Sequence, residues 1–167
     1  MTPLELSRDL REGSSEFLNK RRAVALLDYV SMASLGLVSL WQLGITKKIP
    51  EPSSRWFDAP KVNGSAEAYS YGGVPDAFLG VVSYGITASL AAAGPQDRWN
   101  RPGDRWFAIA MAGKALLDAG QAAKLTYDSW TKYRAFCLWC LIAAGATFAT
   151  VPLALPEAFA ALRNNGR

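Results

Sequence analysis

Three long stretches of the chain contain no charged residue, and the charged residues gather between them. The uncharged stretches are residues 29–46, 77–96 and 135–156. Each has about the ~20 residues that a helix needs to cross ~30 Å of hydrocarbon. A helix of a soluble bundle carries a charged face opposite its apolar face, and these stretches have none. We therefore expect membrane-spanning helices; a soluble helical bundle with Ala-rich core helices is the alternative.

A fourth segment, residues 105–124, is harder to assign because polar residues interrupt it. Lys114 and Asp118 are four positions apart, so they lie on one helix face and can pair. If this segment crosses the membrane, the pair faces the interior of the bundle and is a candidate functional site. The alternative is an interfacial or soluble helix. We favour the crossing, and we expect Asp76, Lys114 and Asp118 to face protein, because a charge in hydrocarbon costs ~2.5 to 3.5 kcal/mol or more.

The predicted fold is all-α: an integral membrane four-helix bundle with a long outer loop after the first span. The chain of 167 residues is long enough for one domain. We expect residues 1–22 to form a polar, amphipathic cytoplasmic arm, 23–156 the membrane domain and 157–167 a cytoplasmic tail, with the first span kept in the mature chain. The connection at residues 46–73 is long for a bare loop and predicts a lid or a short helix.

Lysine and arginine are unevenly divided between the two sides of such a bundle. Ten of these residues lie on the side of the bundle that holds both termini, and six lie on the side of the 46–73 loop. The ten are Arg8, Arg11, Lys20, Arg21, Arg22, Arg98, Arg101, Arg105, Arg163 and Arg167, and the six are Lys47, Lys48, Arg55, Lys61, Lys132 and Arg134. The positive-inside rule therefore places both termini in the cytoplasm. In a bacterium, this means a multi-pass protein of the inner membrane whose 46–73 loop faces an oxidising compartment.

The two cysteines of the chain, Cys137 and Cys140, stand in the stretch FCLWC at the start of the last uncharged segment. Three-residue spacing brings both sulfurs within one helical turn, and a helix N-terminus stabilises a thiolate at the first of them. A zinc site needs four ligands, and a chain with no His and no further Cys cannot supply them from soft side chains, so no metal is expected. A redox pair is favoured, with two inert core cysteines as the alternative.

Two stretches carry a resemblance to a known family. They are YSYGGVPDAFLGVVSYG at 69–85 and YDSWTKYRAFCLWCLIAA at 127–144. Their order, with a long loop before the first and a Cys-x-x-Cys span at the end of the second, resembles the vitamin K epoxide reductase family of membrane thiol oxidoreductases. The resemblance extends over most of residues 22–155.

This resemblance implies a quinone, ubiquinone or menaquinone, as electron acceptor within the four-helix bundle. Cys140 is then the thiol closest to the quinone ring, and Cys137 exchanges disulfides with a thioredoxin-fold protein. Asp76, Leu79 and Tyr84 match residues that line the family's quinone pocket. Gly80 matches a position of the second span that either lines the pocket or packs against another helix. Trp139 either anchors its helix at the interface or stacks on the quinone. We also expect Cys137 to be the thiol open to outer-face water, with Cys140 one turn deeper.

One departure from the family pattern matters for function. Family members carry a second cysteine pair in the loop after the first span, and residues 46–73 have none. Either an outside thiol protein reaches Cys137 directly, or the chain is a degenerate member that binds quinone or lipid as a subunit of a larger membrane complex. Membrane lipid is an expected partner in both cases, and nucleic acid in neither.

Overall fold

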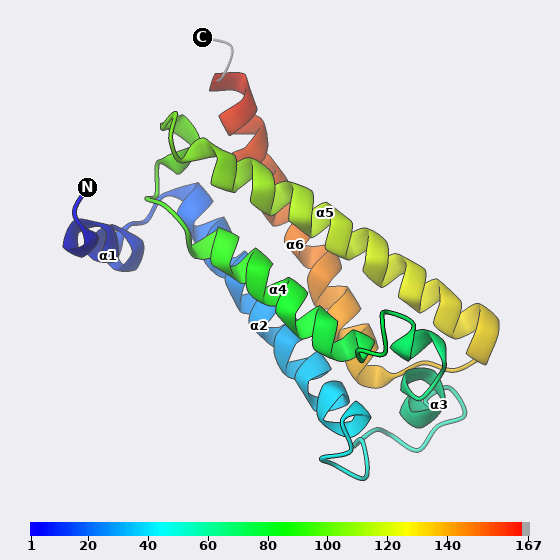
Figure 1. Cartoon of the computed structure of the whole chain (residues 1–167). Helices are drawn as coiled ribbons and strands as arrows, with labels where there is room; N and C mark the ends of the chain where they lie inside the picture. Colours follow the sequence, from blue (N-terminus) through cyan, green and yellow to red (C-terminus); the bar gives the residue numbers. More distant parts are fainter. Residues whose placement is uncertain (165–167) are drawn as a thin grey trace.

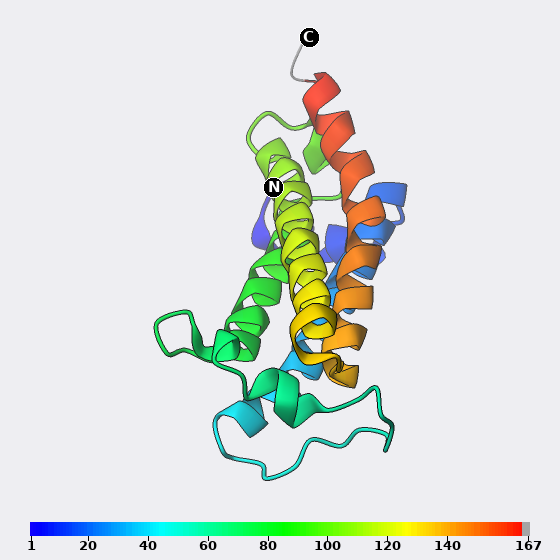
Figure 2. The ribbon, with the colours of Figure 1, turned by 90° about the vertical axis from the view of Figure 1, so that its right-hand side faces the viewer.

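The computed structural model describes residues 1–164, and this part of the chain is helical, with no β-strand (Figure 1). Four long helices, α2, α4, α5 and α6, lie side by side, and both views agree on this arrangement (Figures 1 and 2). The elements are α1 (Pro3–Glu12), α2 (Glu16–Gln42), α3 (Ala59–Asn63), η1 (Glu67–Tyr69), α4 (Asp76–Ala92), η2 (Arg98–Asn100), α5 (Arg105–Asp128), η3 (Ser129–Tyr133) and α6 (Leu138–Arg163). The all-α prediction is confirmed.

Two of the described helices, α2 and α6, are long and apolar enough to cross a membrane. Helix α4 is apolar but has 17 residues, which is ~25 Å of helix at 1.5 Å per residue. Helix α5 has 24 residues and carries Lys114 and Asp118. Four packed helices are therefore present, while four membrane crossings remain a prediction.

Small residues allow the helices to approach closely. At Gly80 of α4, a Cβ would lie 2.4 Å from the Leu35 Cδ1 of α2, a distance that real contacts do not reach. Glycine is therefore the residue that lets Leu35 of α2 press against the α4 backbone. Alanines fill most of the remaining core, among them Ala91, Ala112 and Ala154. Close approach through small residues is typical of helices that pack in membranes.

The 43–75 segment between α2 and α4 covers the end of the bundle at which α6 begins (Figure 2). It contains the short helices α3 and η1, as its length predicted. Two backbone hydrogen bonds tie it to the residue before the cysteine pair: Phe136 N donates to Trp56 O at 2.8 Å, and Asp58 N donates to Phe136 O at 3.0 Å. Helix α1 and the last turn of α6 lie toward the opposite end of the bundle (Figure 1).

At that opposite end, two arginines are buried in contact with the carbonyl end of α4. Arg98 is 0 % exposed and pairs with Glu157 of α6, its Nε and Nη2 each 2.8 Å from a carboxylate oxygen. Its Nη1 donates to the carbonyl oxygens of Leu90 and Ala93 at 2.6 and 2.7 Å. Arg98 therefore joins α6 to the last turn of α4.

The second buried arginine, Arg21 of α2, serves the same helix end. Its guanidinium donates to four carbonyl oxygens at 2.7 to 2.9 Å, those of Ala91, Ala93, Gly94 and Pro95. The last carbonyls of a helix have no partner within the helix, so a buried helix end needs donors from elsewhere. Arg21 and Arg98 supply them, and together they fasten α2, α4 and α6 at one point.

We expect Glu157→Leu to destabilise the protein by ~3 to 5 kcal/mol, because it leaves the Arg98 guanidinium buried without its counter-charge. The measurement is the unfolding of purified protein in mild detergent, followed by circular dichroism. Asp97→Asn is the control, since it breaks the exposed pair with Arg101, whose side chains are 50 % and 41 % accessible. That variant should lose at most ~1 kcal/mol. Equal effects of the two substitutions would contradict a structural role for the buried pair.

Candidate functional site

The two cysteines lie at the start of α6, as expected. Cys137 is the N-cap residue, and its sulfur accepts a hydrogen bond from the backbone N–H of Cys140 at 3.3 Å. Both thiols are free. A helix N-terminus and a backbone N–H donor both favour the charged form of a sulfur placed there, so Cys137 is the better placed of the two thiols to form the reactive thiolate.

The burial of the two sulfurs differs from the expectation. Cys137 is 1 % exposed and belongs to a buried cluster with Val38, Ile49, Ala59 and Ala77, so the prediction that outer-face water reaches it was wrong. Ala59 is the first residue of α3, and α3 covers Cys137 because residues 56–58 pair with Phe136. Cys140 is the more accessible of the two and lines a cavity.

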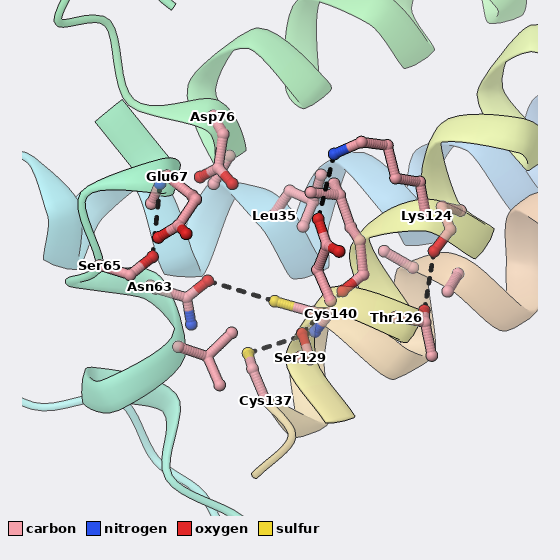
Figure 3. A pocket seen from close by; sticks show the side chains of 18 of the residues that line it. Leu35, Asn63, Ser65, Glu67, Asp76, Lys124, Thr126, Ser129, Cys137 and Cys140 are labelled. Atoms are coloured by element: carbon pink, nitrogen blue, oxygen red, sulfur yellow. Dashed lines mark hydrogen bonds and ion pairs between the residues drawn. The ribbon is translucent and has the colours of Figure 1, made fainter. Parts of the chain in front are cut away.

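Asn63, at the end of α3, holds the Cys140 sulfur. The Cys140 Sγ lies 3.4 Å from Asn63 Oδ1, to which the thiol donates (Figure 3). The amide nitrogen of Asn63 donates to Ala59 O at 2.9 Å, which leaves the oxygen to face the thiol. Asn63 is 4 % exposed, so its orientation is fixed by these contacts rather than by water. The loop thereby contributes a polar group to the cysteine site.

The cavity beside Cys140, called here the thiol cavity, has a volume of about 150 Å³. Both cysteines line it, together with Leu35, Asp76 and Tyr84. Asp76 opens α4, and its Oδ1 accepts from Gln42 Nε2 at 2.8 Å. The Tyr84 hydroxyl lies 2.8 Å from that of Thr147. The lining also includes charged side chains, those of Glu67, Lys124 and Asp128. A cavity with an apolar wall, polar groups and two thiols suits a flat molecule that carries oxygens.

A second cavity, called here the side cavity, adjoins the first between α4 and α5. Its volume is about 310 Å³, and it shares Asp76 and Tyr84 with the thiol cavity. Leu79 and Gly80 line this one. Three of the four predicted pocket residues therefore lie around two adjoining cavities: Asp76 and Tyr84 on both, and Leu79 on the side cavity alone.

Trp139, the fourth predicted pocket residue, lies outside the lining of both cavities. Its indole N–H donates to the carbonyl oxygen of Pro50 at 2.6 Å. The structure thus favours anchoring over stacking on a ligand, and the anchor point is the 43–75 segment. Trp139 fastens this segment to α6 next to the cysteine pair.

Sequence reasoning missed Gln42 and Asn63. Gln42 Nε2 donates to the carbonyl oxygen of Asn63 at 3.1 Å as well as to Asp76, and the Tyr69 hydroxyl donates to Gln42 O at 3.2 Å. These side chains connect the end of α2, the loop and the start of α4. The one sequence signal was a lone amide, Gln42, near the end of an uncharged stretch.

The rim of the thiol cavity is bridged by Glu67 of η1. Its carboxylate accepts from the Tyr133 hydroxyl of η3 and lies 3.4 Å from Lys132 Nζ. The Tyr133 hydrogen bond holds the pKa of Glu67 below its usual value. Next to this bridge, the ring of Trp130 stacks on Phe136 with 5.6 Å between centroids and lies 5.7 Å from that of Trp56. The loop is therefore fixed over the cysteines by polar and aromatic contacts.

The fold and the geometry of this site agree with the comparison to known proteins. A search of curated proteins found no match. The model of the vitamin K epoxide reductase family matches residues 22–155, which include the cysteine pair, both cavities and the covering loop. The match spans more than half of the chain and bears out the resemblance of the Cys-x-x-Cys and Gly-Val-Pro-Asp stretches. The chain belongs to the vitamin K epoxide reductase family, whose members are membrane-associated thiol oxidoreductases that use quinones.

Proposed function

We propose that this chain oxidises thiols of an outside protein and passes the two electrons through Cys137 and Cys140 to a membrane quinone. The observation that carries the proposal is the placement of a free Cys-x-x-Cys pair at a helix N-terminus, with the Cys140 sulfur on the wall of a mainly apolar cavity. A thiolate reacts with a disulfide, whereas a quinone needs an apolar site beside a thiol. In this proposal, Cys137 meets the first requirement and Cys140 the second.

Two balanced steps make up the cycle. The dithiol of the partner reduces the Cys137–Cys140 disulfide and itself becomes a disulfide, through a mixed disulfide at Cys137. The reduced pair then gives two electrons to the quinone, so that the S–S bond forms again and quinol leaves. The acceptor is ubiquinone or menaquinone, and the partner is a thiol protein of the thioredoxin fold. Cys137 exchanges with the partner, and Cys140 serves the quinone.

Without loop cysteines, the proposed cycle needs direct contact between the partner and Cys137. Ala59 packs in the same buried cluster as Cys137, so the loop places an inert methyl group where a relay thiol would be useful. Electrons cannot pass through alanine, and the partner therefore reacts with Cys137 itself. This requires α3 to lift from the sulfur during exchange.

The proposed setting is a bacterial inner membrane, crossed four times by α2, α4, α5 and α6, with cytoplasmic termini. The Lys/Arg asymmetry of ten to six supports this orientation. The first 22 residues and the residues after 156 then lie at the cytoplasmic side, and the 43–75 segment lies outside. In this orientation the cysteine pair meets an oxidising compartment.

A degenerate subunit is the second candidate, and the burial of Cys137 is the observation that favours it. In this case, the cavities hold a quinone or lipid, and the chain packs within a larger membrane complex without turnover. The two candidates differ in one measurable property, the reoxidation of the reduced pair by added quinone.

The topology is tested by reporter fusions at the C-terminus and within residues 46–73. We expect the two reporters to give opposite sides, cytoplasmic and outer, because the loop is separated from the C-terminus by three crossings, those of α4, α5 and α6. Recovery of the chain in the soluble fraction after membrane sedimentation, or both reporters on one side, would contradict this prediction.

The thiol roles are tested with Cys137→Ser and Cys140→Ser, purified in mild detergent, reduced and mixed with a short-chain quinone. Neither variant should form quinol, because each lacks one sulfur of the disulfide. Cys140→Ser should accumulate a mixed disulfide at Cys137 with a thioredoxin-fold probe, since no second thiol resolves it, and Cys137→Ser should trap none. Wild-type quinone-dependent thiol oxidation in both variants would show that the pair is not the redox centre, and the subunit function would take its place.

The role of Asn63 is tested with Asn63→Leu, which keeps the number of side-chain heavy atoms and removes both the acceptor for the Cys140 thiol and the amide donor to Ala59 O. A hydrogen bond contributes ~0.5 to 1.5 kcal/mol, so quinol formation in a single turnover should slow by about twofold to tenfold. Asn100→Leu, at an exposed asparagine far from the cysteines, is the matched control and should keep the wild-type rate. If the two variants have the same rate, Asn63 does not position the thiol.

A further inference from the structure

A group of charged side chains lies inside the bundle, away from the cysteines. Lys114 and Asp118 of α5 pair at 2.5 Å, as their spacing predicted. Both contact α4: Lys114 Nζ donates to Ser83 Oγ at 2.6 Å, and Asp118 accepts from Ser83 and Thr87, each at 2.9 Å. Their side chains are 20 % and 10 % exposed. The prediction that this pair faces protein is confirmed.

A third ionisable side chain, Asp28 of α2, completes this group, which we call the buried cluster (Asp28, Lys114 and Asp118). Asp28 is 1 % exposed, and its Oδ2 has no hydrogen-bond partner. Asp28 lies on α2, which packs against α4, the helix whose Ser83 and Thr87 bond the ion pair. An ionised carboxylate buried with an unpaired oxygen is costly, whereas a neutral carboxylic acid there keeps its proton available for transfer.

The buried cluster reaches the side cavity. Asp118 and Ser83 both line it, and its other lining residues include Asp76 and Tyr84, which also line the thiol cavity. The Ser83 hydroxyl is hydrogen-bonded to both members of the ion pair. Hydrogen bonds therefore connect the ion pair to the wall of the side cavity. The side cavity adjoins the thiol cavity, which Cys140 lines.

The proton balance of the proposed function gives this arrangement a role. Quinone takes up two electrons and two protons to become quinol. The reduced cysteine pair supplies both electrons. In the thiolate form of Cys137, which the Cys140 N–H at the helix start favours, only the Cys140 thiol has a proton to give. One quinone oxygen can take the proton of Cys140. The other oxygen needs a second donor.

We propose that the buried cluster is this donor: Lys114 releases a proton through the Ser83 hydroxyl into the side cavity, and in the same step the carboxylic acid of Asp28 passes its proton to the Lys114–Asp118 pair, so that the transfer to quinone needs both groups. The net step combines a thiolate, a thiol, a quinone and one proton, and gives a disulfide and a quinol. The proton lost from Asp28 is replaced from water before the next cycle. This inference rests on the proposed function, because it supplies the proton for that reaction.

A purely structural role is the competing explanation, and it has a different energetic expectation. Replacing a buried ion pair by apolar residues of similar volume is often neutral or stabilising, so packing alone does not require these charges. A proton donor requires them. The two explanations separate when the charges are removed without leaving one of them unpaired.

The experiment uses full-length reduced protein in lipid nanodiscs, mixed rapidly with a short-chain quinone, with quinol formation followed by absorbance. The variants are Asp28→Asn and the double variant Lys114→Met/Asp118→Leu, with Asp97→Asn as an exposed control. Quinone affinity and the unfolding midpoint are measured for each. General acid catalysis contributes about a hundredfold or more, so both variants should slow quinol formation about a hundredfold at unchanged quinone affinity. Added formate, a small acid, should restore part of the rate in Asp28→Asn.

The other outcomes overturn the inference. Quinol formation at the wild-type rate in both variants would overturn it. A loss of rate that accompanies a loss of quinone affinity and is not restored by formate would also overturn it. If Asp28→Asn fails to fold, the double variant decides by the same criteria, and failure of both to fold assigns the cluster to structure. The wild-type arm is separate: absence of quinone-dependent oxidation there refutes the proposed function itself.

Discussion

The fold depends on how the carbonyl end of α4 is satisfied where water does not reach it. Helix α4 ends inside the bundle, and a buried carbonyl without a donor costs several kcal/mol. Arg21 and Arg98 provide the donors, and Glu157 balances one of the charges. Because each guanidinium has five N–H groups in a rigid fork, two side chains can serve one whole helix end. The register of α2 against α4 and α6 follows from this contact.

Local pattern was sufficient for most of the fold and for part of the site. The long helices and the start of α6 next to Cys137 follow from the uncharged stretches, which are properties of neighbouring residues. Two helix ends do not: α2 begins at Glu16, within the expected arm, and α6 continues to Arg163, within the expected tail. The burial of Arg21 and Arg98 could not be predicted in this way, since their partners are up to 74 and 59 positions away. A count of positive charges treated both as surface residues. They are the largest of the fully buried side chains in the part of the chain that the structure describes.

The same limit explains what was missed around the cysteines. Spacing placed both thiols on one turn, but whether a sulfur is open depends on what the loop does, and α3 lies over Cys137 through contacts between residues 56–58 and Phe136. Asn63 and Gln42 carry no motif, and their roles appear only when α2, α3 and α4 meet. Lys114 and Asp118 were recognisable from their spacing, whereas Asp28 became part of the same group only through the packing of α2.

The pairing of the loop with Phe136 also affects which oxidants the protein encounters. A sulfur that is 1 % exposed reacts only in the fraction of molecules in which its cover is open. Small oxidants cannot stabilise this open form, because they make few contacts with it. A folded protein can, since it binds the displaced loop and the uncovered surface together. Under the proposed function, the cover over Cys137 is thus a filter for size: it limits irreversible oxidation of this sulfur by small oxidants, and a partner protein that binds the displaced loop still reaches it.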